Sequence, residues 1–240
     1  MPMERSTPRL VALMLSLLLA LLLPGRGAGA SAPPRLSDER LVFSTAFGHI
    51  EMAFYPDVAP HTVSHILKLA RIGGYDSNHF FRVDKGFVAQ VGEVADARLV
   101  PLTPLQKMEA VKTVPLEVSP EVKHTKGVVS LGRFDDPHSG RSSFSLLLGD
   151  APHLDMKYTI FGQVTQGLEV LDKMQLVETK REGIFVMPKE RITIFSSYVY
   201  SSSAAFSDTG TCEQRLRELS ERFNIQSHQL QEARARCLPG

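Results

Sequence analysis

The stretch FFRVDKGFVAQ at residues 80–90 decides how the rest of the chain is interpreted. We expect short strands within and around it, from His79 to Val83 and from Phe87 to Val91. Taken alone, an arginine such as Arg82 on an alternating strand is usually just solvated. Whether Arg82 has a functional role must therefore be decided from the other segments of the chain.

Those segments predict a mainly β fold with two helices. A helix is expected from Pro60 to Arg71, because proline suits the first helical position and two glycines at 73–74 supply a stop. A second, shorter helix is expected from Gln166 to Met174, with residues 168, 171 and 174 facing one way. Further strands are predicted at His49 to Phe54, Gly127 to Leu131, Phe144 to Leu148, Tyr158 to Val164 and Arg191 to Tyr200.

Many short strands with two helices indicate a barrel or a sandwich whose open ends the helices cover. The stretch from Val94 to Glu117 has weak periodicity and three prolines, so it is expected to be a long surface excursion. Bulky residues alternate along the strands, which favours a filled interior over a barrel that encloses a small apolar ligand.

Four ordered segments resemble the cyclophilin family. Residues 80–90 match six positions of its signature F-H-R-V-x-x-G-F-M-x-Q, with Val88 as an apolar replacement for the methionine. The other segments are FYPDVAPHTV at 54–63, GVVSLG at 127–132 followed by 140–144, and residues 153–162, which begin HLD and end YTIFG. The resemblance spans about residues 40 to 196 and implies a closed eight-stranded antiparallel β-barrel capped by two α-helices.

The resemblance also implies peptidyl-prolyl cis-trans isomerase activity and a site for it. Arg82 is the implied catalytic residue, and Gln90 is its polar neighbour in the groove. The pocket for the substrate's proline ring is implied to be lined by Phe87, Val88, Phe144 and Leu154. The remaining implied substrate-binding residues are Tyr158 at the rim, His153, and Gly132 and Arg133, which supply backbone to the bound peptide.

The chain departs from the family pattern at three places. Ser142 stands where a glutamine is common beside the catalytic arginine. The usual glycine-rich loop is replaced by residues Val94 to Thr113. His153 occupies the place of a tryptophan that matters for cyclosporin binding in many members, so reduced affinity for cyclosporin-type inhibitors is expected.

These residue types suit proline isomerisation. Rotation about an X-Pro bond must break amide resonance, over a barrier of about 20 kcal/mol. In the twisted amide the proline nitrogen becomes pyramidal, and a fixed guanidinium donor can meet its lone pair more strongly than it meets the planar ground state. One charge-assisted hydrogen bond contributes only about 1.5–3 kcal/mol, so gripping the ring and removing water must supply the remainder.

No bond is made or cleaved in this reaction, so we expect no cofactor and no metal. His61 and His65 have the i, i+4 spacing of a zinc pair, but no nearby cysteine or acidic cluster completes a site. Ser142, Ser143 and Ser145 lack a paired base at a readable spacing and are expected to be ordinary strand residues.

The first 30 residues predict a cleavable signal peptide. Arg5 and Arg9 precede a leucine-rich run from Leu10 to Leu23, and Ala28-Gly29-Ala30 supplies a small-x-small cleavage pattern. A membrane-spanning helix needs about 20 apolar residues, so cleavage is favoured over a retained anchor. The mature protein is then expected to lack a membrane span and to lie in the ER or Golgi lumen or outside the cell.

The predicted isomerase domain covers residues 39–200, between linkers at 31–38 and 201–210. The chain has 27 Lys+Arg against 26 Asp+Glu, and this nearly neutral net charge does not favour binding to nucleic acid. Residues 211–237 carry a heptad stripe, expected to be one amphipathic helix or a helical hairpin. Three roles are open for this stripe: docking on its own domain, self-association, and binding to a partner helix. Cys212 and Cys237 lie about 37 Å apart in a straight helix, so a bond within the chain requires the hairpin.

The sequence therefore predicts an isomerase that acts on proline-containing polypeptides of the secretory pathway. The rival reading is a catalytically weak member of the family that binds proline-containing peptides as an interaction module. Ser142 and the rebuilt loop favour this rival, while Arg82 and the apolar slot favour catalysis.

Overall fold

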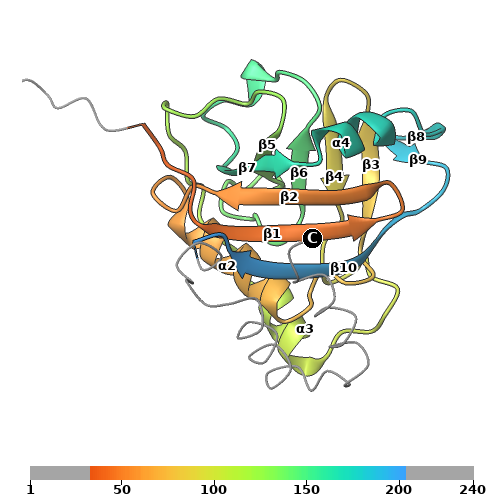
Figure 1. Ribbon diagram of the computed structural model, residues 1–240, viewed down its shortest axis with the longest axis horizontal. Coiled ribbons are helices and arrows are strands. Elements are labelled where there is room, and N and C mark those ends of the chain that lie inside the picture. The colour runs from red at the N-terminus through yellow and green to blue at the C-terminus, as the bar shows by residue number, and fades with distance from the viewer. Residues whose placement is uncertain (1–32, 204–240) are drawn as a thin grey trace, which may run out of the picture. The chain divides into compact units, whose positions relative to one another are not determined.

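The computed structural model describes residues 33–203, and within them eight strands close into an antiparallel barrel (Figure 1). This confirms the predicted fold class. The strands follow one another around the barrel as β1 (Glu39–Thr45), β10 (Ile192–Ser201), β3 (His79–Asp84), β4 (Val88–Val91), β6 (Phe144–Leu147), β5 (Val128–Leu131), β7 (Ile160–Gln166) and β2 (Gly48–Phe54).

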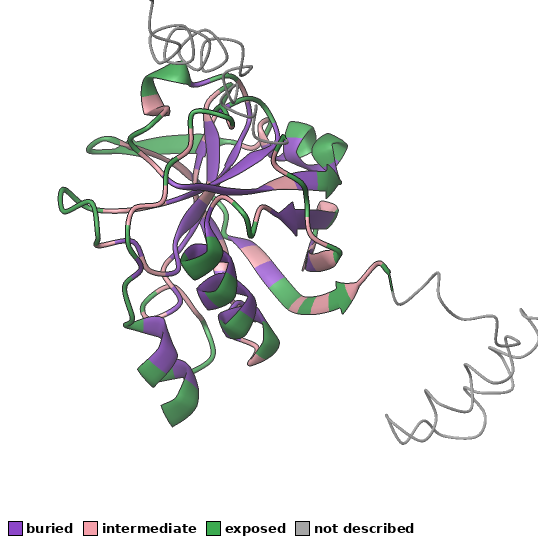
Figure 2. Ribbon diagram, turned by 90° about the vertical axis from the view of Figure 1, so that its left-hand side faces the viewer, coloured by how far each residue is buried: buried purple, intermediate pink, exposed green. Residues whose placement is uncertain are grey.

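Large side chains fill the interior of the barrel. The rings of Phe43, Tyr75 and Phe144 are fully buried and lie in mutual contact, with centroids 5.3–5.9 Å apart. Phe54 and Phe161 stack at 6.1 Å on the neighbouring strands. Burying one such side chain stabilises the fold by about 1.5–3 kcal/mol, and aromatic pairing adds to this. Figure 2 shows the converging strands in the buried colour, as a packed interior requires.

Helix α2 (Pro60–Arg71) has the predicted bounds. Pro60 occupies its first turn, where its missing N–H costs nothing, and Lys68 and Arg71 lie in the last turn, where they face the negative end of the helix dipole. Its buried side, which includes Ile66, Leu67 and Leu69, packs on the barrel core.

Helix α4 (Leu168–Met174) begins two residues later than predicted, because Gly167 is in a left-handed conformation with φ of 93°. A Cβ at this position would meet the His49 carbonyl oxygen at 2.3 Å, so only glycine fits. Leu171 and Met174 are buried as expected. Leu168 was expected to face the same way but is 38% exposed, and Val170 takes its place against the barrel.

The excursion from Val94 to Glu117 contains a third helix, α3 (Pro104–Ala110), which the weak periodicity did not predict. Thr103 and Gln106 form a reciprocal capping box at its start. The Gln106 side-chain amide also donates to the carbonyl oxygens of Ile72 and Gly73 at the end of α2. The excursion is therefore fastened to α2 rather than loose (Figure 1).

A two-stranded hairpin, β8 (Thr179–Glu182) and β9 (Phe185–Pro188), was also missed by the sequence analysis. Gly183 provides the left-handed residue of its turn, with φ of 59°. The Phe185 ring meets the Phe81 ring edge-on at 5.6 Å, which places the hairpin beside β3. This hairpin contributes to the site described below.

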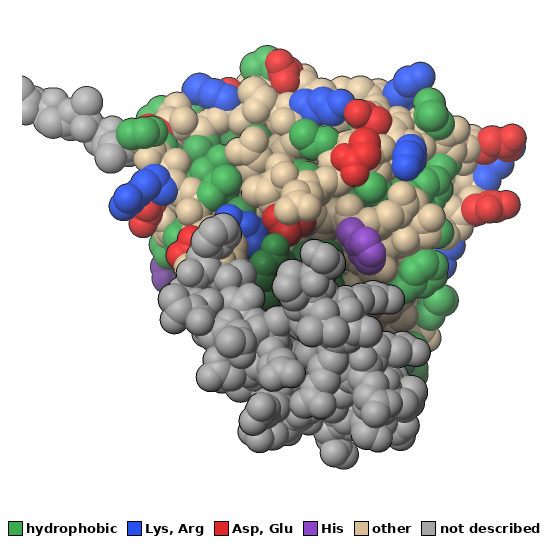
Figure 3. Space-filling model, viewed as in Figure 1, with side chains coloured by type: hydrophobic (Ala, Val, Ile, Leu, Met, Phe, Trp, Pro, Cys, Tyr) green, Lys and Arg blue, Asp and Glu red, His purple; other side chains and the backbone are tan. Residues whose placement is uncertain are grey.

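Positive and negative side chains are interspersed on the face shown in Figure 3, in keeping with the balanced charge of the sequence. None of the helices within residues 33–203 is long and apolar enough to cross a membrane. The expected signal peptide at 1–30 and the expected helical tail at 211–237, with Cys212 and Cys237, lie outside the described residues.

Candidate active site

A hollow of about 710 Å³ opens on the outer face of β3, β4, β5 and β6. It contains eight of the ten residues that the sequence analysis assigned to the site, and it brings them together from strands β3 and β4 and from the segments between β3 and β4, after β5 and before β7. Those eight are Arg82, Phe87, Val88, Gln90, Gly132, Arg133, Leu154 and, on the rim, Tyr158.

A polar row crosses the floor of this hollow. The strand register pairs Arg82 with Gln90, Gln90 with Ser145, and Ser145 with Ser130. Directly paired residues on one face of a sheet have Cβ atoms about 5 Å apart, so the four side chains form a continuous line. Two residues before Gln90 on β4, Val88 pairs with Leu147 on β6. These two buried side chains begin an apolar row beside the polar one.

Arg82 is held in a fixed orientation at one end of the row. One terminal nitrogen donates to Asp84 Oδ2 at 3.0 Å. The guanidinium carbon lies 5.2 Å from the centre of the Phe87 ring and 5.7 Å from the centre of the Phe185 ring. Its Nε is buried and has no hydrogen-bond partner among the described residues. The Arg82 side chain keeps 18% exposure, and the one hydrogen bond given for it within the described residues uses a single terminal nitrogen, so the guanidinium is a positioned donor with accessible N–H groups that can meet a ligand.

The apolar side of the hollow is a slot formed by Phe87 and Leu154. Both side chains are half-buried and pack on the cluster that includes the buried Val88. The His153 ring stacks on the outer face of Phe87, with centroids 5.6 Å apart. A slot with two apolar walls beside a fixed cation suits a ring attached to a polar amide.

Phe144 corrects the sequence analysis. It was expected to line the proline pocket, but it is fully buried and its ring packs in the barrel core against Phe43, Tyr75 and Phe161. Side chains alternate along a strand, so its neighbours Ser143 and Ser145 face the hollow instead. These serines had been taken as ordinary strand residues. The alternation of serine with Phe144 and Leu146 was the signal that could have shown this.

Ser142 lies away from the hollow. Its hydroxyl donates to Glu93 and accepts from the backbone N–H of Val94, and the residue is fully buried. The hydroxyl beside Gln90 is that of Ser143, which accepts from Gln90 Nε2 at 3.2 Å. We call Ser130, Ser143 and Ser145 the serine floor.

Gly132 and Arg133 form the edge where β5 leaves the sheet. The Gly132 N–H donates to the Ser143 carbonyl oxygen at 2.8 Å, and a Cβ here would lie 3.2 Å from Gln90 Nε2. The Arg133 guanidinium lies 4.6 Å from the centre of the Tyr158 ring and donates from Nε to the Lys157 carbonyl oxygen. Arg133 therefore fastens the segment that carries Tyr158 to the edge of the hollow.

A buried histidine fastens the slot wall from behind. His124 Nδ1 lies 2.9 Å from Asp155 Oδ1, and its Nε2 lies 2.9 Å from the Ser130 hydroxyl. Burial lowers the pKa of His124, against the opposing influence of Asp155. The hydrogen bond from the His124 backbone N–H leads the influences that lower the pKa of Asp155. A neutral imidazole thus bridges Asp155, next to Leu154, to the serine floor.

Sequence reasoning missed this histidine because its partners lie 6 and 31 residues away, at no recognisable spacing. It also missed Phe134, Ile184 and Phe185, which line the hollow from a loop and from the β8–β9 hairpin. For the hairpin a signal existed, since Gly183 separates two short stretches that suit strands.

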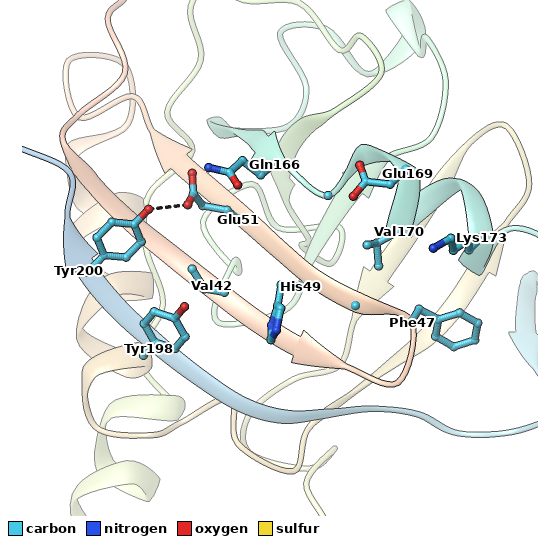
Figure 4. Close-up of a pocket in the computed structure, with 12 residues that line it drawn as sticks. Val42, Phe47, His49, Glu51, Gln166, Glu169, Val170, Lys173, Tyr198 and Tyr200 are labelled. Atoms are coloured by element: carbon cyan, nitrogen blue, oxygen red, sulfur yellow. Dashed lines mark hydrogen bonds between the residues drawn. The ribbon is translucent and has the colours of Figure 1, made fainter. Parts of the chain in front are cut away.

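Figure 4 shows a second hollow, of about 650 Å³, between strands β1, β2 and β10 and helix α4. Its most buried acid is Glu51, which accepts from the Tyr200 hydroxyl at 2.5 Å and from the Thr165 hydroxyl at 2.6 Å. Both carboxylate oxygens are occupied within the protein, so this acid has a structural role. Within residues 33–203, no three His, Cys, Asp or Glu side chains gather where they could hold a metal ion.

Comparison with known proteins identifies the family. Residues 40–199 match the family described as cyclophilin type peptidyl-prolyl cis-trans isomerase/CLD. The chain is 52% identical over 206 residues to the peptidyl-prolyl cis-trans isomerase CYP23 of Arabidopsis thaliana, covering 86% of this chain and 88% of that protein. It is 31% identical to peptidyl-prolyl cis-trans isomerase B of Escherichia coli, covering 65% of this chain and 96% of that protein.

Among solved structures, a Cryptosporidium parvum cyclophilin type peptidyl-prolyl cis-trans isomerase, crystallised in the presence of the dipeptide Ala-Pro, is similar in fold. The TM-score is 0.57 at 21% identity, and the match covers 68% of this chain and 99% of that one. At this identity the likeness concerns the fold alone.

Proposed function

This chain belongs to the cyclophilin-type peptidyl-prolyl cis-trans isomerases, and we propose that Arg82 and the Phe87–Leu154 slot perform its reaction on proteins of the secretory pathway. The observation that carries the proposal is the unused donor capacity of a fixed guanidinium beside an apolar slot. The proposed mechanism uses a charged donor and a ring pocket that lie in contact, and in this hollow both include the Phe87 ring.

The slot acts first, by binding. A proline ring between Phe87 and Leu154 leaves water, which favours the twisted amide because that state is less polar than the planar one. Gly132 and Arg133 supply backbone along the edge of the hollow, where an extended peptide can run. The ring and the chain on both sides of it are then held while the bond between them rotates.

Arg82 acts at the transition state. As the amide twists, the proline nitrogen gains a lone pair that accepts a hydrogen bond from the guanidinium. In the planar ground state this lone pair is delocalised and accepts poorly, so the interaction lowers the barrier rather than merely tightening binding. Asp84 on one side and the rings of Phe87 and Phe185 on the others hold the guanidinium in place, so little reorganisation is needed.

Exchange spectroscopy on an Ala-Pro peptide tests the proposal. Wild-type protein should accelerate exchange, and Arg82→Ala should lower kcat/KM by about 10- to 150-fold, the value of one charge-assisted hydrogen bond. Arg71→Ala is the matched control, because Arg71 is an exposed arginine on α2 with an ion pair to Glu39. Equal activity of the Arg82 variant and the control would refute the assignment.

The secretory location is supported by the N-terminal sequence, where Arg5 and Arg9 precede the leucine-rich run 10–23 and the small residues at 28–30. Expression of the full chain in secretory cells should yield a protein that begins at Ser31, as read by N-terminal sequencing. Leu18→Arg should abolish both cleavage and entry into the pathway. Uncleaved wild-type protein in the cytosol would contradict this location.

Weak cyclosporin binding is also proposed, from His153. The imidazole stacks on Phe87 but offers less apolar area than the tryptophan common at this position. His153→Trp should strengthen cyclosporin binding by about tenfold, corresponding to roughly 1.4 kcal/mol. Calorimetric titration of both proteins measures the difference, and no gain in the variant would contradict the explanation.

A further inference from the structure

The serine floor distinguishes this hollow from a purely apolar ring pocket. Ser130 lies on β5, Ser145 on β6 and Ser143 directly before β6, and all three face the hollow. Two of their hydroxyls are engaged. Ser143 donates to the Val91 carbonyl oxygen at 2.7 Å, and Ser130 lies 2.9 Å from His124 Nε2.

Ser145 differs from its two neighbours. It is half-buried at the centre of the polar row, paired with Gln90 on one side and with Ser130 on the other. Among the hydrogen bonds of the described residues, none involves its hydroxyl group. A hydroxyl can both donate and accept, so Ser145 presents an unused polar group on the floor beside the slot.

An unmodified proline ring cannot use this group. The ring carries only carbon and hydrogen beyond its nitrogen, and seating it over Ser145 removes water from the hydroxyl without replacing the lost hydrogen bond. In a peptide whose backbone follows the edge at Gly132, ring carbon C4 is the atom farthest from the backbone. It therefore reaches deepest toward the floor.

We propose that the enzyme prefers substrates in which the proline carries a hydroxyl on C4, as in 4-hydroxyproline, and that Ser145 determines this preference. The inference rests on the proposed function of the slot. A C4 hydroxyl forms a hydrogen bond with the Ser145 hydroxyl and so replaces the hydrogen bond to water that the ring displaced. The plain ring leaves the Ser145 hydroxyl unpaired. Sites built to hydrogen-bond a substrate hydroxyl discriminate against the analogue that lacks it.

Such substrates are chemically reasonable for this protein. Hydroxyproline arises in collagen-type sequences, which are secreted proteins, and each of its X-Hyp bonds isomerises as slowly as an X-Pro bond. The carbon walls of the slot, Phe87 and Leu154, remain suited to the ring of either substrate. Only the floor responds to the added hydroxyl.

The test compares three peptides that differ in one residue: proline, (4R)-hydroxyproline and (4R)-methylproline. The methyl group matches the added size without the hydrogen bond. Exchange spectroscopy should give the wild-type protein a kcat/KM about 3- to 10-fold higher for hydroxyproline than for proline, the value of one net neutral hydrogen bond. The methylproline peptide should show no such gain.

Ser145→Ala removes the hydroxyl with little change in size and should bring the hydroxyproline-to-proline ratio of kcat/KM close to one. Ser196→Ala, which removes an exposed serine on β10, is the matched control and should keep the wild-type ratio. A wild-type ratio of one or below, or a preference that survives in Ser145→Ala, would overturn the proposal.

Peptide affinities measured by calorimetry test the preference for hydroxyproline independently of the proposed catalysis. If the wild-type protein turns over neither peptide, the catalytic assignment fails, and the affinities still decide the preference. Tighter binding of the hydroxyproline peptide that is lost in Ser145→Ala supports the inference in that case, and equal affinities refute it.

Discussion

The guanidinium of Arg82 lies against the ring of Phe87, with 5.2 Å between the guanidinium carbon and the ring centroid. In the proposed mechanism, the residue that grips the substrate ring is therefore also one of the residues that orient the guanidinium of Arg82. A change in the slot wall should therefore alter the orientation of the guanidinium, and the first prediction follows from this contact.

Phe87→Ala should lower kcat/KM by about 100-fold, because it removes both a wall of the slot and a partner of Arg82. Loss of grip raises KM, and loss of orientation lowers kcat, so both should change in steady-state assays. Phe195→Ala is the control, since Phe195 is a 60% exposed phenylalanine on β10. A change in KM alone would show that Phe87 does not orient Arg82.

Phe185→Ala should have a smaller effect, a loss of about 3- to 10-fold concentrated in kcat, because the hairpin contacts Arg82 without forming the slot. Ile184→Ala serves as the comparison, because Ile184 also lines the hollow from this hairpin and is 79% exposed but has no aromatic ring to interact with the guanidinium. Equal losses in the two variants would indicate that the hairpin acts through bulk apolar surface.

His124→Ala should destabilise the fold by about 2–3 kcal/mol, since it leaves Asp155 and the Ser130 hydroxyl without their buried partner. Activity at a temperature where the variant is folded should also fall, because Leu154 adjoins Asp155. Urea denaturation and exchange spectroscopy measure the two effects. Full stability in the variant would mean that ordered water replaces the imidazole.

Acid should weaken the fold in a pH range set by Glu109, a 3% exposed residue of α3 whose carboxylate pairs with Lys68 of α2. Burial alone would raise its pKa, but hydrogen bonds and charges from Lys112 and Lys68 outweigh burial and lower the pKa to about 2. A depressed folded pKa means that the unfolded chain binds the proton first. The contribution of the ionised Glu109 to the free energy of unfolding is therefore complete above about pH 4.5 and is lost as the pH falls toward 2.

Urea midpoints measured from pH 5 to pH 2 check this expectation. Glu109→Gln should be less stable than the wild type at pH 5, and its midpoint should fall less steeply with acid. His65 adds a loss at higher pH, because burial lowers its pKa and the unfolded chain is protonated first below about pH 6.5. Parallel curves for the two proteins would exclude Glu109 as the source.

The barrel could be predicted from the sequence because the signals for its strands and helices are local in the chain. Strand alternation, Pro60 at a helix start and the ordered segments around residues 80–90 each predicted an element that the structure contains. Helix α3 was not predicted because it is only 7 residues long. Its position also depends on the hydrogen bond from Gln106 to the end of α2, a contact between residues 34 positions apart.

The site was predicted less completely, for a reason of geometry. Assigning Phe144 to the pocket was wrong because, on a strand, a difference of one position exchanges the core face for the groove face. The same difference concealed Ser143 and Ser145. The His124–Asp155 pair could not be predicted either, since only the folded chain brings these residues together.

Arg82→Lys gives the most direct measurement of the central claim, because it keeps the positive charge and removes the planar fork of donors. In exchange spectroscopy with an Ala-Pro peptide, kcat and kcat/KM should fall together by about 10-fold or more while peptide affinity stays within about twofold, the pattern of an interaction made only in the transition state. A lysine variant with wild-type kcat would contradict the account, because a positive charge at position 82 would then suffice without the planar fork of donors.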